Sequence, residues 1–341
     1  MMHTLITEVR QKANGKGMSN LSFITLAMFG VLVAVFGVAS LLVPRFFDIN
    51  NVSNLIAQQA DIIIGIGVTF LMISGYFDLS VGGIIAMAAV LSAYFSQAPS
   101  AASFELGSGL GIPYGLALVL TLICCVGIGA INAFFIVKMK IASVIVTLGT
   151  LAFSRGIAMI VAQGDQRNTG LPPIFKECGS FTFVGTLNLA VLIMIVLLIG
   201  ALIVEKKTVF GRRMYQIGAN QTAARLSGVK VDRELSLLYM LSALLGGISG
   251  IVMASKFNSG NCALGTGYEF DALVVTVLGG TSVFGGFGSV AGMVIGAFIL
   301  GILSTSVNML GFPPSLQMLV RALVIIVAIL AQRFALDRRN V

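Results

Sequence analysis

The sequence predicts an all-α polytopic membrane protein with about ten transmembrane helices. Hydrophobic residues make up 57% of the 341 residues and charged residues only 10%, whereas about 25% of the residues in ordinary soluble proteins are charged. Apolar segments of the length needed to cross the hydrocarbon core recur along the chain. Basic residues are concentrated in alternate loops between these segments. These features exclude a soluble globular domain.

Ten apolar segments can be placed along the chain. A full span needs about 20 apolar residues, and fewer are enough where a helix is broken or buried in protein. The second, third and eighth segments fit least well; the second carries Asp61 near its start, and the eighth is short and ends in glycines. The predicted segments are 21–43, 55–74, 80–96, 114–137, 142–162, 187–204, 235–255, 270–284, 289–309 and 315–332.

The basic residues indicate an orientation. With the N-terminus inside, 15 of the 21 Lys and Arg residues fall in inner loops, four fall in outer loops, and Arg155 and Arg321 fall within spans. This positive-inside bias places both termini in the cytoplasm and supports an even number of spans. The net charge of +8 is explained by these loops. We expect no nucleic acid as a partner, because no basic stripe with interleaved aromatic residues is present.

A long outer loop divides the spans into two groups of five. This loop, at 163–186, contains Pro172 and Pro173. Because five is odd, the second group would enter the membrane inverted relative to the first, as is common in transporters. We therefore predict two five-helix halves related by inverted pseudo-symmetry.

The ends of the chain complete the predicted domain organisation. Residues 1–20 are polar, and the apolar run that follows is too long for the core of a signal peptide, so it is expected to remain as a membrane anchor. The sequence thus predicts a cytoplasmic N-terminal segment at 1–20, a transmembrane domain at 21–334 and a cytoplasmic tail at 335–341.

Residues that carry enzyme or metal chemistry are scarce. The only histidine is His3, so a Ser/His/Asp triad is not expected, and no cluster has metal-ligand spacing. No phosphate-binding G-x-x-x-x-G-K-[ST] motif is present, so this chain is not expected to hydrolyse ATP. We therefore predict no enzyme activity, no catalytic residue, no cofactor and no metal.

The four cysteines do not change this prediction. Cys124 and Cys125 lie in an apolar span, where cysteine behaves as a small hydrophobic residue. Cys178 and Cys262 both fall in predicted outer loops, and a disulfide between them remains open.

The longest polar interruption of the C-terminal half is Thr208–Val229, TVFGRRMYQIGANQTAARLSGV. The charge distribution places it in a cytoplasmic loop of about 205–234. Glycines are predicted to bracket short helical pieces, alanines to allow close docking, and arginines to bind carboxylates of a partner that supplies energy. The alternative is an ordinary basic loop that only sets the topology.

The segment ISGYFDLSVGG, from Ile73 to Gly83, holds polar residues between the second and third spans. Its glycines permit a sharp turn or an unwound helix end. Asp78 and Ser80 can cap the helix that follows, since their oxygens can accept from its first N–H groups. A direct role in a solute path is the alternative, because polar groups in membranes are costly.

Acidic residues begin the eighth predicted span on its outer side. Glu269 and Asp271 suit a helix N-terminus, where the macrodipole favours negative charge. Contact with an external partner or a place at a substrate entrance is the alternative.

A glycine-rich run, Gly279–Gly288, overlaps the end of that span and contains Thr281 and Ser282. Irregular backbone at this depth is tolerated only where it is buried in protein or lines a cavity. Gly292 and Gly296 then form a small-xxx-small pair that predicts close helix packing.

Four further polar residues lie within predicted spans. Arg155 and Arg321 are expected to pair with a carboxylate or to extend toward the interface. Asn132 and Asn308 are expected to hydrogen-bond between helices, with contact to a solute as the alternative.

Four stretches of this sequence resemble permeases of monosaccharide-type ABC importers, the ribose, galactose, xylose and autoinducer-2 group. ISGYFDLSVGG resembles their GGIDLSVG signature. IASVIVTLGTLAFSRG (141–156), FGRRMYQIGANQTAARLSGVKV (210–231) and YEFDALVVTVLGGTSVFGGFGSVAG (268–292) are similar to later motifs. The matches cover about 45–333. Tyr76 stands where the family usually has Gly, Phe270 where it usually has Leu, and Asp61 is unusual; these departures bear on substrate identity.

The resemblance implies a fold like that of type II importers and a set of partners. Two permease subunits, identical or different, would enclose the pathway in the membrane lipid. One or two ATP-binding subunits would dock on the cytoplasmic face, and a periplasmic or lipid-anchored solute-binding protein would deliver the solute. The chain would be the permease subunit for a monosaccharide or related small polar solute. Alternatives are a nucleoside or autoinducer-like solute, an ion-coupled secondary carrier, or a structural membrane protein.

The resemblance also assigns candidate residues. Those expected to couple to the ATP-binding subunit are Gly211, Arg212, Arg213, Gly218, Asn220, Ala223, Ala224, Arg225, Leu226 and Gly228. The polar residues discussed above, not the resemblance, supply the candidates for structural or pathway roles, which are Asp78, Ser80, Asn132, Arg155, Glu269, Asp271, Thr281, Ser282 and Asn308.

Overall fold

A computed structural model describes residues 28–44, 46–48, 51, 63–99, 109–163, 166–180, 182–184 and 187–313, with five further residues between 315 and 323. The predicted segment 1–20, the tail 335–341 and most of the predicted span 315–332 lie outside the described residues, as do Asp61 and Arg321.

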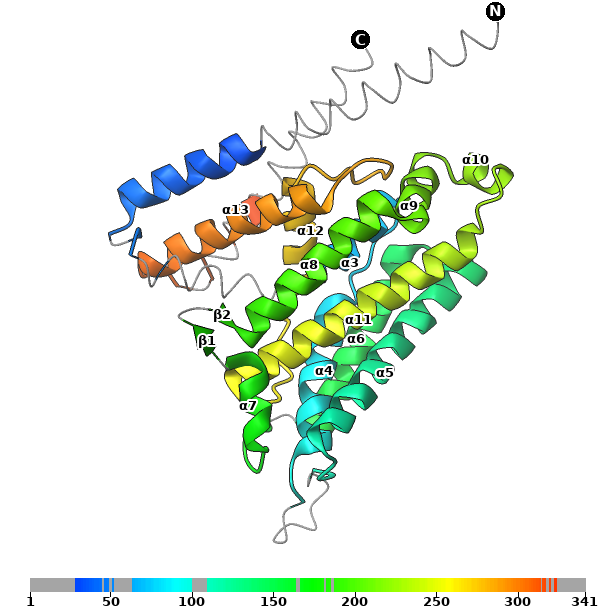
Figure 1. Ribbon diagram of the computed structural model, residues 1–341. Coiled ribbons are helices and arrows are strands. Elements are labelled where there is room, and N and C mark those ends of the chain that lie inside the picture. Colours follow the sequence, from blue (N-terminus) through cyan, green and yellow to red (C-terminus); the bar gives the residue numbers. More distant parts are fainter. Residues whose placement is uncertain are drawn as a thin grey trace, which may run out of the picture.

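The described chain is almost entirely helical (Figure 1). Its one small sheet pairs β1 (Thr182–Val184) with β2 (Leu187–Asn188) in antiparallel fashion. The helix Met28–Leu42 precedes α3 (Ile63–Ile73), α4 (Val81–Ser96), α5 (Tyr114–Ala133), the π-helical turn η2 (Phe134–Lys138), α6 (Ser143–Ala162), α7 (Pro173–Ser180), α8 (Leu189–Lys207), α9 (Val209–Ala219), α10 (Gln221–Leu226), α11 (Val231–Phe257), α12 (Tyr268–Leu278) and α13 (Val290–Met309).

The apolar segments predicted from the sequence largely coincide with helices. Five helices are long and apolar enough to cross a membrane, namely α5 with η2, α6, α8, α11 and α13. The helix Met28–Leu42, α3 and α4 are shorter apolar helices. One boundary was wrong: the predicted segment 270–284 is helical only to Leu278, because the glycines that follow adopt a loop. The total of ten spans and the inverted relation of two halves stay predictions.

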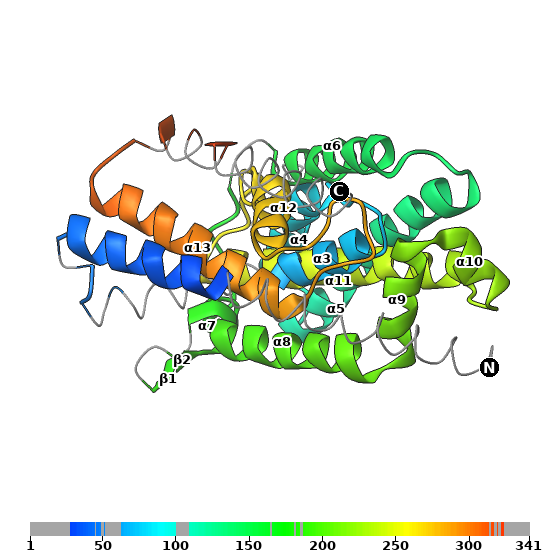
Figure 2. The ribbon, with the colours of Figure 1, turned by 90° about the horizontal axis from the view of Figure 1, so that it is seen from above.

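The 27-residue helix α11 is the centre of the packing. It contacts α3, α4 and α5 along its length, and α7 near its end. Gly250 allows part of this contact, because an added Cβ would lie 2.5 Å from the carbonyl oxygen of Ile85 in α4. In Figure 2, α3, α4 and α11 lie between α6 on one side and α8 on the other.

The outer helices expose large apolar side chains. On α6 these include Ile145 and Ile160, and on α8 they include Val196 and Ile203, each more than half exposed. Such continuous apolar surfaces are unfavourable in water, and they fit contact with lipid or with another membrane subunit.

Helices α12 and α13 meet with their backbones in contact. An added Cβ at Gly292 would lie 2.1 Å from the carbonyl oxygen of Gly279, and one at Gly296 would lie 2.2 Å from that of Val275. Only glycine leaves room for this approach. The small-xxx-small pair predicted from the sequence is therefore confirmed.

The basic residues gather at one end of the molecule. We call it the coupling end, after the coupling residues predicted from the sequence. It holds α9 and α10, the ends of η2 and α8, the starts of α6 and α11, and the loop 279–289 (Figure 1). Its described Lys and Arg residues are Lys138, Lys140, Lys206, Lys207, Arg212, Arg213, Arg225, Lys230 and Arg233. The opposite end, with α7 and the small sheet, holds Arg167, Lys176 and Lys256.

Candidate functional site

Two short helices form the tip of the coupling end, as the sequence predicted. Helix α9 begins after Thr208, whose side chain accepts from the N–H of Gly211 at 3.1 Å. Helix α10 begins after Asn220, whose side chain accepts from the N–H of Ala223 at 2.9 Å. Both are N-caps of the usual kind. The role of Asn220 here is thus to start a helix.

The glycines of this region act differently from the prediction. Gly211 and Gly218 lie inside α9 and do not bracket it; only Gly228, with a φ of +83°, follows a helix end. An added Cβ at Gly218 would lie 1.8 Å from the carbonyl oxygen of Ile73 and 2.5 Å from the nitrogen of Gly286. The glycine is therefore needed for close packing of α9 on the end of α3 and on the glycine-rich loop.

Gly211 serves the same purpose at the other end of α9. An added Cβ there would lie 2.3 Å from the carbonyl oxygens of Val204 and Glu205. The corner between α8 and α9 is therefore tight. On α10, Ala223 is exposed and Ala224 is buried, while Leu226 projects from the surface with 86% of its area exposed.

Two of the three candidate arginines pair within the chain. The Nη1 atom of Arg213 lies 2.6 Å from Oε1 of Glu234, which is buried at the start of α11. The Nη2 atom of Arg225 lies 2.5 Å from Oδ1 of Asp232. These pairs fasten α9 and α10 to α11. Arg212 is exposed and makes no ion pair among the described residues.

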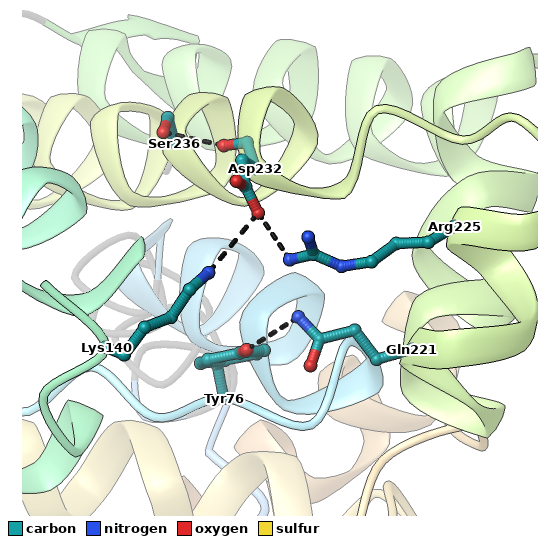
Figure 3. Close-up of polar contacts among 6 residues, drawn as sticks. All are labelled: Tyr76, Lys140, Gln221, Arg225, Asp232 and Ser236. Carbon is teal, nitrogen blue, oxygen red and sulfur yellow. Dashed lines mark hydrogen bonds and ion pairs between the residues drawn. The ribbon is translucent and has the colours of Figure 1, made fainter. Parts of the chain in front are cut away.

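Figure 3 shows how α10 meets its neighbours. Lys140 lies 3.6 Å from the same Asp232 oxygen that Arg225 contacts. The side-chain amide of Gln221 donates to the hydroxyl of Tyr76 at 3.1 Å. Tyr76 therefore contacts α10 at the coupling end. Because the Asp232 pairs are about half exposed, water screens them, and each is worth roughly 0.2–1 kcal/mol.

A cationic hollow lies between the end of η2 and the start of α11. Its volume is about 440 Å³. The lining residues are Lys138, Arg225, Val229, Lys230, Val231, Asp232, Arg233 and Ser236. Four of these side chains are basic and one is acidic, so the hollow is suited to an acidic group of a partner.

The glycine-rich loop lies directly beneath α9. Its backbone is irregular, as predicted, with positive φ at Gly280, Gly285, Gly286 and Gly288. The N–H of Gly286 donates to the carbonyl of Ile73 at 2.8 Å. Thr281 is buried, and the hydroxyl of Ser282 accepts from the N–H of Phe284 at 3.1 Å. The Ser282 contact is local, whereas the Gly286 contact joins the loop to the end of α3.

Asp78 lies at the centre of a buried polar network. One carboxylate oxygen accepts from the hydroxyl of Ser80 at 2.5 Å, and the other accepts from the hydroxyl of Ser242 on α11 at 2.7 Å. Asn132 on α5 donates to Ser80 at 2.9 Å, and Thr150 on α6 donates to Asn132 at 2.7 Å. The network joins three helices to the start of α4.

The cap predicted for Asp78 and Ser80 takes a different form. Ser80 occupies the N-cap position of α4, but its side chain makes no capping bond. Its hydroxyl is already engaged with Asp78 and Asn132. Asp78 accepts from the backbone N–H of Ser80 at 2.9 Å, which stabilises the turn before the helix rather than its first turn.

A second polar cluster surrounds the start of α12. The guanidinium of Arg155 on α6 donates to the hydroxyl of Thr266 and, at 3.4 Å, to the carbonyl of Gly82. The carboxyl group of Glu269 packs over the same glycine, where an added Cβ would lie 2.0 Å from Oε2. That Glu269 oxygen has no hydrogen-bond partner among the described residues.

Exposure differs across this cluster. Thr266 is exposed, Arg155 is half-buried and Glu269 is 9% exposed, so the carboxyl group lies behind an accessible polar rim.

The remaining predicted residues lie apart from this cluster or at its edge. Asp271, two residues after Glu269 in α12, is half-buried. Asn308 is exposed near the end of α13. Cys262 is a free thiol, and the side chain of Cys178 lies outside the described residues.

Sequence reasoning missed two residues of the coupling end, Glu205 and Tyr215. Glu205 is buried in the last turn of α8 and accepts from the backbone N–H of Val290 at 3.0 Å. The Tyr215 hydroxyl lies 2.9 Å from Oε1 of Glu205 and 2.7 Å from the carbonyl oxygen of Gly288. The sequence does hold a signal for Glu205, because this acidic residue stands between an apolar span and two lysines.

The helical architecture, the lipid-facing apolar surfaces and the internal polar clusters define a polytopic membrane subunit. The chain belongs to the family described as branched-chain amino acid transport system / permease component, whose model matches residues 51–329. No solved structure matches the chain.

Several relatives are sugar permeases. The chain is 33% identical over 310 residues to the ribose import permease protein of Haemophilus influenzae, covering 90% of this chain and 92% of that protein. It is 34% identical over 304 residues to the ribose import permease protein of Bacillus subtilis, covering 87% and 88%. It is 32% identical over 340 residues to the L-arabinose transport system permease protein of Escherichia coli, covering 96% and 98%. The resemblance to monosaccharide-type importer permeases is confirmed.

We predict that Asp78→Ala destabilises the protein. The change leaves the hydroxyls of Ser80 and Ser242 without their acceptor, and a buried donor left without a partner costs about 1–3 kcal/mol. Thermal unfolding in detergent will measure the effect. The control is Thr121→Ala, which removes a buried hydroxyl that, among the described residues, bonds the carbonyl of Ala117 in its own helix. Equal melting temperatures for the two variants would contradict a structural role of the network.

Proposed function

We propose that this chain is the membrane-spanning permease subunit of an ATP-driven ABC importer for a monosaccharide or a related small polar solute. The observation that carries the proposal is the match to ribose and L-arabinose permeases over almost the full length of both chains. The family description names branched-chain amino acids, but these full-length relatives favour a sugar. A nucleoside or autoinducer-like solute is the second candidate within this class.

We propose that the coupling end receives the ATP-binding subunit. The support is geometric: α9 and α10 form a protruding pair of short helices, with exposed Arg212, Ala223 and Leu226. The cationic hollow beside them suits a carboxylate of the partner. Arg213 and Arg225 would act indirectly, by holding the two helices against α11.

We further propose the orientation and the assembly. The coupling end faces the cytoplasm, in line with the positive-inside rule, and both termini lie on that side. Ten spans form two inverted halves within the bacterial inner membrane. A second permease subunit packs against the first, for which the apolar surface of α6 is available. A periplasmic or lipid-anchored solute-binding protein docks at the end opposite α9.

We propose that Glu269 and Arg155 contribute to the solute path. A buried carboxylate oxygen without a partner is costly in a membrane protein, which is why such groups often mark function. Sugar hydroxyls can donate to this oxygen and accept from the guanidinium of Arg155. The exposed Thr266 beside them gives access to the cluster.

Reconstitution tests the transport class. Liposomes containing this chain with its ATP-binding subunit, and supplied with the binding protein, are expected to take up radiolabelled ribose or L-arabinose, but not leucine, when ATP is present. Uptake by this chain alone, driven by an ion gradient, would establish a secondary carrier instead. ATP-dependent uptake of leucine without sugar uptake would overturn the substrate class.

Charge reversal at Arg225 tests the docking surface. Arg225→Glu places a carboxylate beside Asp232 and releases α10 from α11, so the ATP-binding subunit should no longer co-purify with the permease. The matched control is Lys176→Glu at the opposite end, which should retain the subunit. Because the ATP-binding subunit reaches only the cytoplasmic side, this result would also support the proposed orientation. Normal co-purification and uptake by Arg225→Glu would refute the docking assignment.

Neutralising Glu269 tests the solute path. Glu269→Gln keeps the size of the side chain but weakens its acceptor for a sugar hydroxyl, so the uptake rate should fall about tenfold, as expected for a hydrogen bond to a charged group. Retention of the ATP-binding subunit should not change. Glu177→Gln, an exposed acid on α7, is the control. Wild-type uptake by Glu269→Gln would remove this residue from the path.

A further inference from the structure

Glu205 is a buried carboxylate that has no part in the proposed docking surface or solute path. It lies in the last turn of α8, with 5% of its area exposed. One oxygen faces the Tyr215 hydroxyl at 2.9 Å, and the other accepts from the N–H of Val290 at 3.0 Å. Val290 is the first residue of α13. One side chain therefore connects the end of α8, the middle of α9 and the start of α13.

Both contacts of Glu205 are with hydrogen-bond donors. The start of α13 presents free N–H groups and the positive end of the helix dipole. Ser289 accepts from the N–H of Gly292 at 3.0 Å, so Glu205 and Ser289 together satisfy two of these N–H groups. The hydrogen bond from Val290 to Glu205 thus fixes the position of the first residue of α13.

Tyr215 adds the connection to α9. Its single hydroxyl proton lies between two acceptors, Oε1 of Glu205 and the carbonyl oxygen of Gly288, the latter at 2.7 Å. Burial, and then the negative charge of Glu205, raise the pKa of Tyr215. The hydroxyl therefore remains a donor at physiological pH.

Helix α9 is tightly packed against its neighbours around this connection. Gly218 lies against the carbonyl of Ile73 and the nitrogen of Gly286, and Gly211 lies against the end of α8. Backbone atoms are in contact on both sides of Tyr215. A displacement of α9 is therefore expected to move the loop and the start of α13 with it, because packed interfaces shift between arrangements rather than deform.

We infer that Glu205 and Tyr215 form a latch that positions the start of α13 and the glycine-rich loop on α9. The inference rests on the proposed function, in which α9 receives movement from the ATP-binding subunit. The latch carries that movement to α13, and through the glycine contact with α12 toward the Glu269 cluster. Glu205 and Tyr215 act as positioning residues and touch neither solute nor nucleotide.

The experiment compares Glu205→Gln, Tyr215→Phe and the double variant in the complete reconstituted importer. The monosaccharide is the one that the wild type transports. Solute taken up and ATP hydrolysed are measured in the same liposomes, and their ratio is the readout. Thr121→Val, which removes a buried hydroxyl within α5 and keeps a similar side-chain size, is the control.

The latch predicts that each single variant assembles with the ATP-binding subunit and hydrolyses ATP, but moves about tenfold less solute per ATP, as expected for losing one hydrogen bond to a charged group. The double variant should be no worse than the more affected single variant, because both remove the same connection. Thr121→Val should keep the wild-type ratio.

Other outcomes separate the latch from simpler explanations. A residue that only stabilises the fold would lower uptake and ATP hydrolysis in proportion and leave their ratio unchanged, which would overturn the latch. Tyr215→Phe keeps the packed ring, so it decides the question even if Glu205→Gln fails to assemble. A wild type without ATP-dependent uptake would instead refute the proposed function, and this result is distinguishable because it precedes any comparison of variants.

Discussion

Inside a bilayer the chain has no water to satisfy its polar groups, and the arrangement of this protein depends on that constraint. A buried polar side chain is therefore costly unless it finds a partner, and most of those in the described residues do so within the chain, with the Glu269 oxygen as an exception. Asp78 does so with Ser80 and Ser242, and Asn132 extends the same network to α6 through Thr150. A network that crosses three helices fixes their relative positions in a way that apolar packing alone does not.

The same constraint governs the irregular backbone. The loop 279–289 is not helical, so its N–H and carbonyl groups need partners from elsewhere. They find them at the end of α3, where Gly286 bonds Ile73, and on α9, where Tyr215 reaches Gly288. Glycines at Gly218 and Gly286 allow this approach. Helix α9 therefore covers the loop. The same helix is proposed to receive movement from the ATP-binding subunit, and it also supplies a hydrogen bond to the loop.

Local patterns in the sequence were sufficient to predict where most of the described long helices lie. Apolar segments marked nearly all the described long helices, and the caps at Thr208 and Asn220 explain why the polar stretch forms two short helices. The end of α12 was misplaced, because glycines with apolar neighbours do not reveal where a helix stops. Gly211 and Gly218 were assigned to helix ends, since a glycine in a sequence does not show whether it serves a turn or a close contact.

Contacts between distant parts of the chain were not predictable in the same way. Glu205 and Val290 are separated by 85 positions, and no periodicity or spacing links them. From the sequence, Arg213 and Arg225 were predicted to bind carboxylates of a partner. The fold instead places Glu234 and Asp232 of this chain beside them. The charge of a side chain is visible in the sequence, but the group that neutralises it is set by the packing of helices.

Tyr76 shows how a contact that the sequence does not reveal changes the interpretation of a departure from the family pattern. Its replacement of the usual glycine was taken to bear on the solute, because it lies in the segment with Asp78. In the structure its hydroxyl accepts from Gln221 of α10, while Asp78 lies among buried hydroxyl groups. Residues only two positions apart therefore face different environments, since this segment is extended and turns between α3 and α4. A departure at Tyr76 bears on the fit of α10 against the membrane helices, whereas the polar groups around Glu269 are the ones proposed to meet the solute.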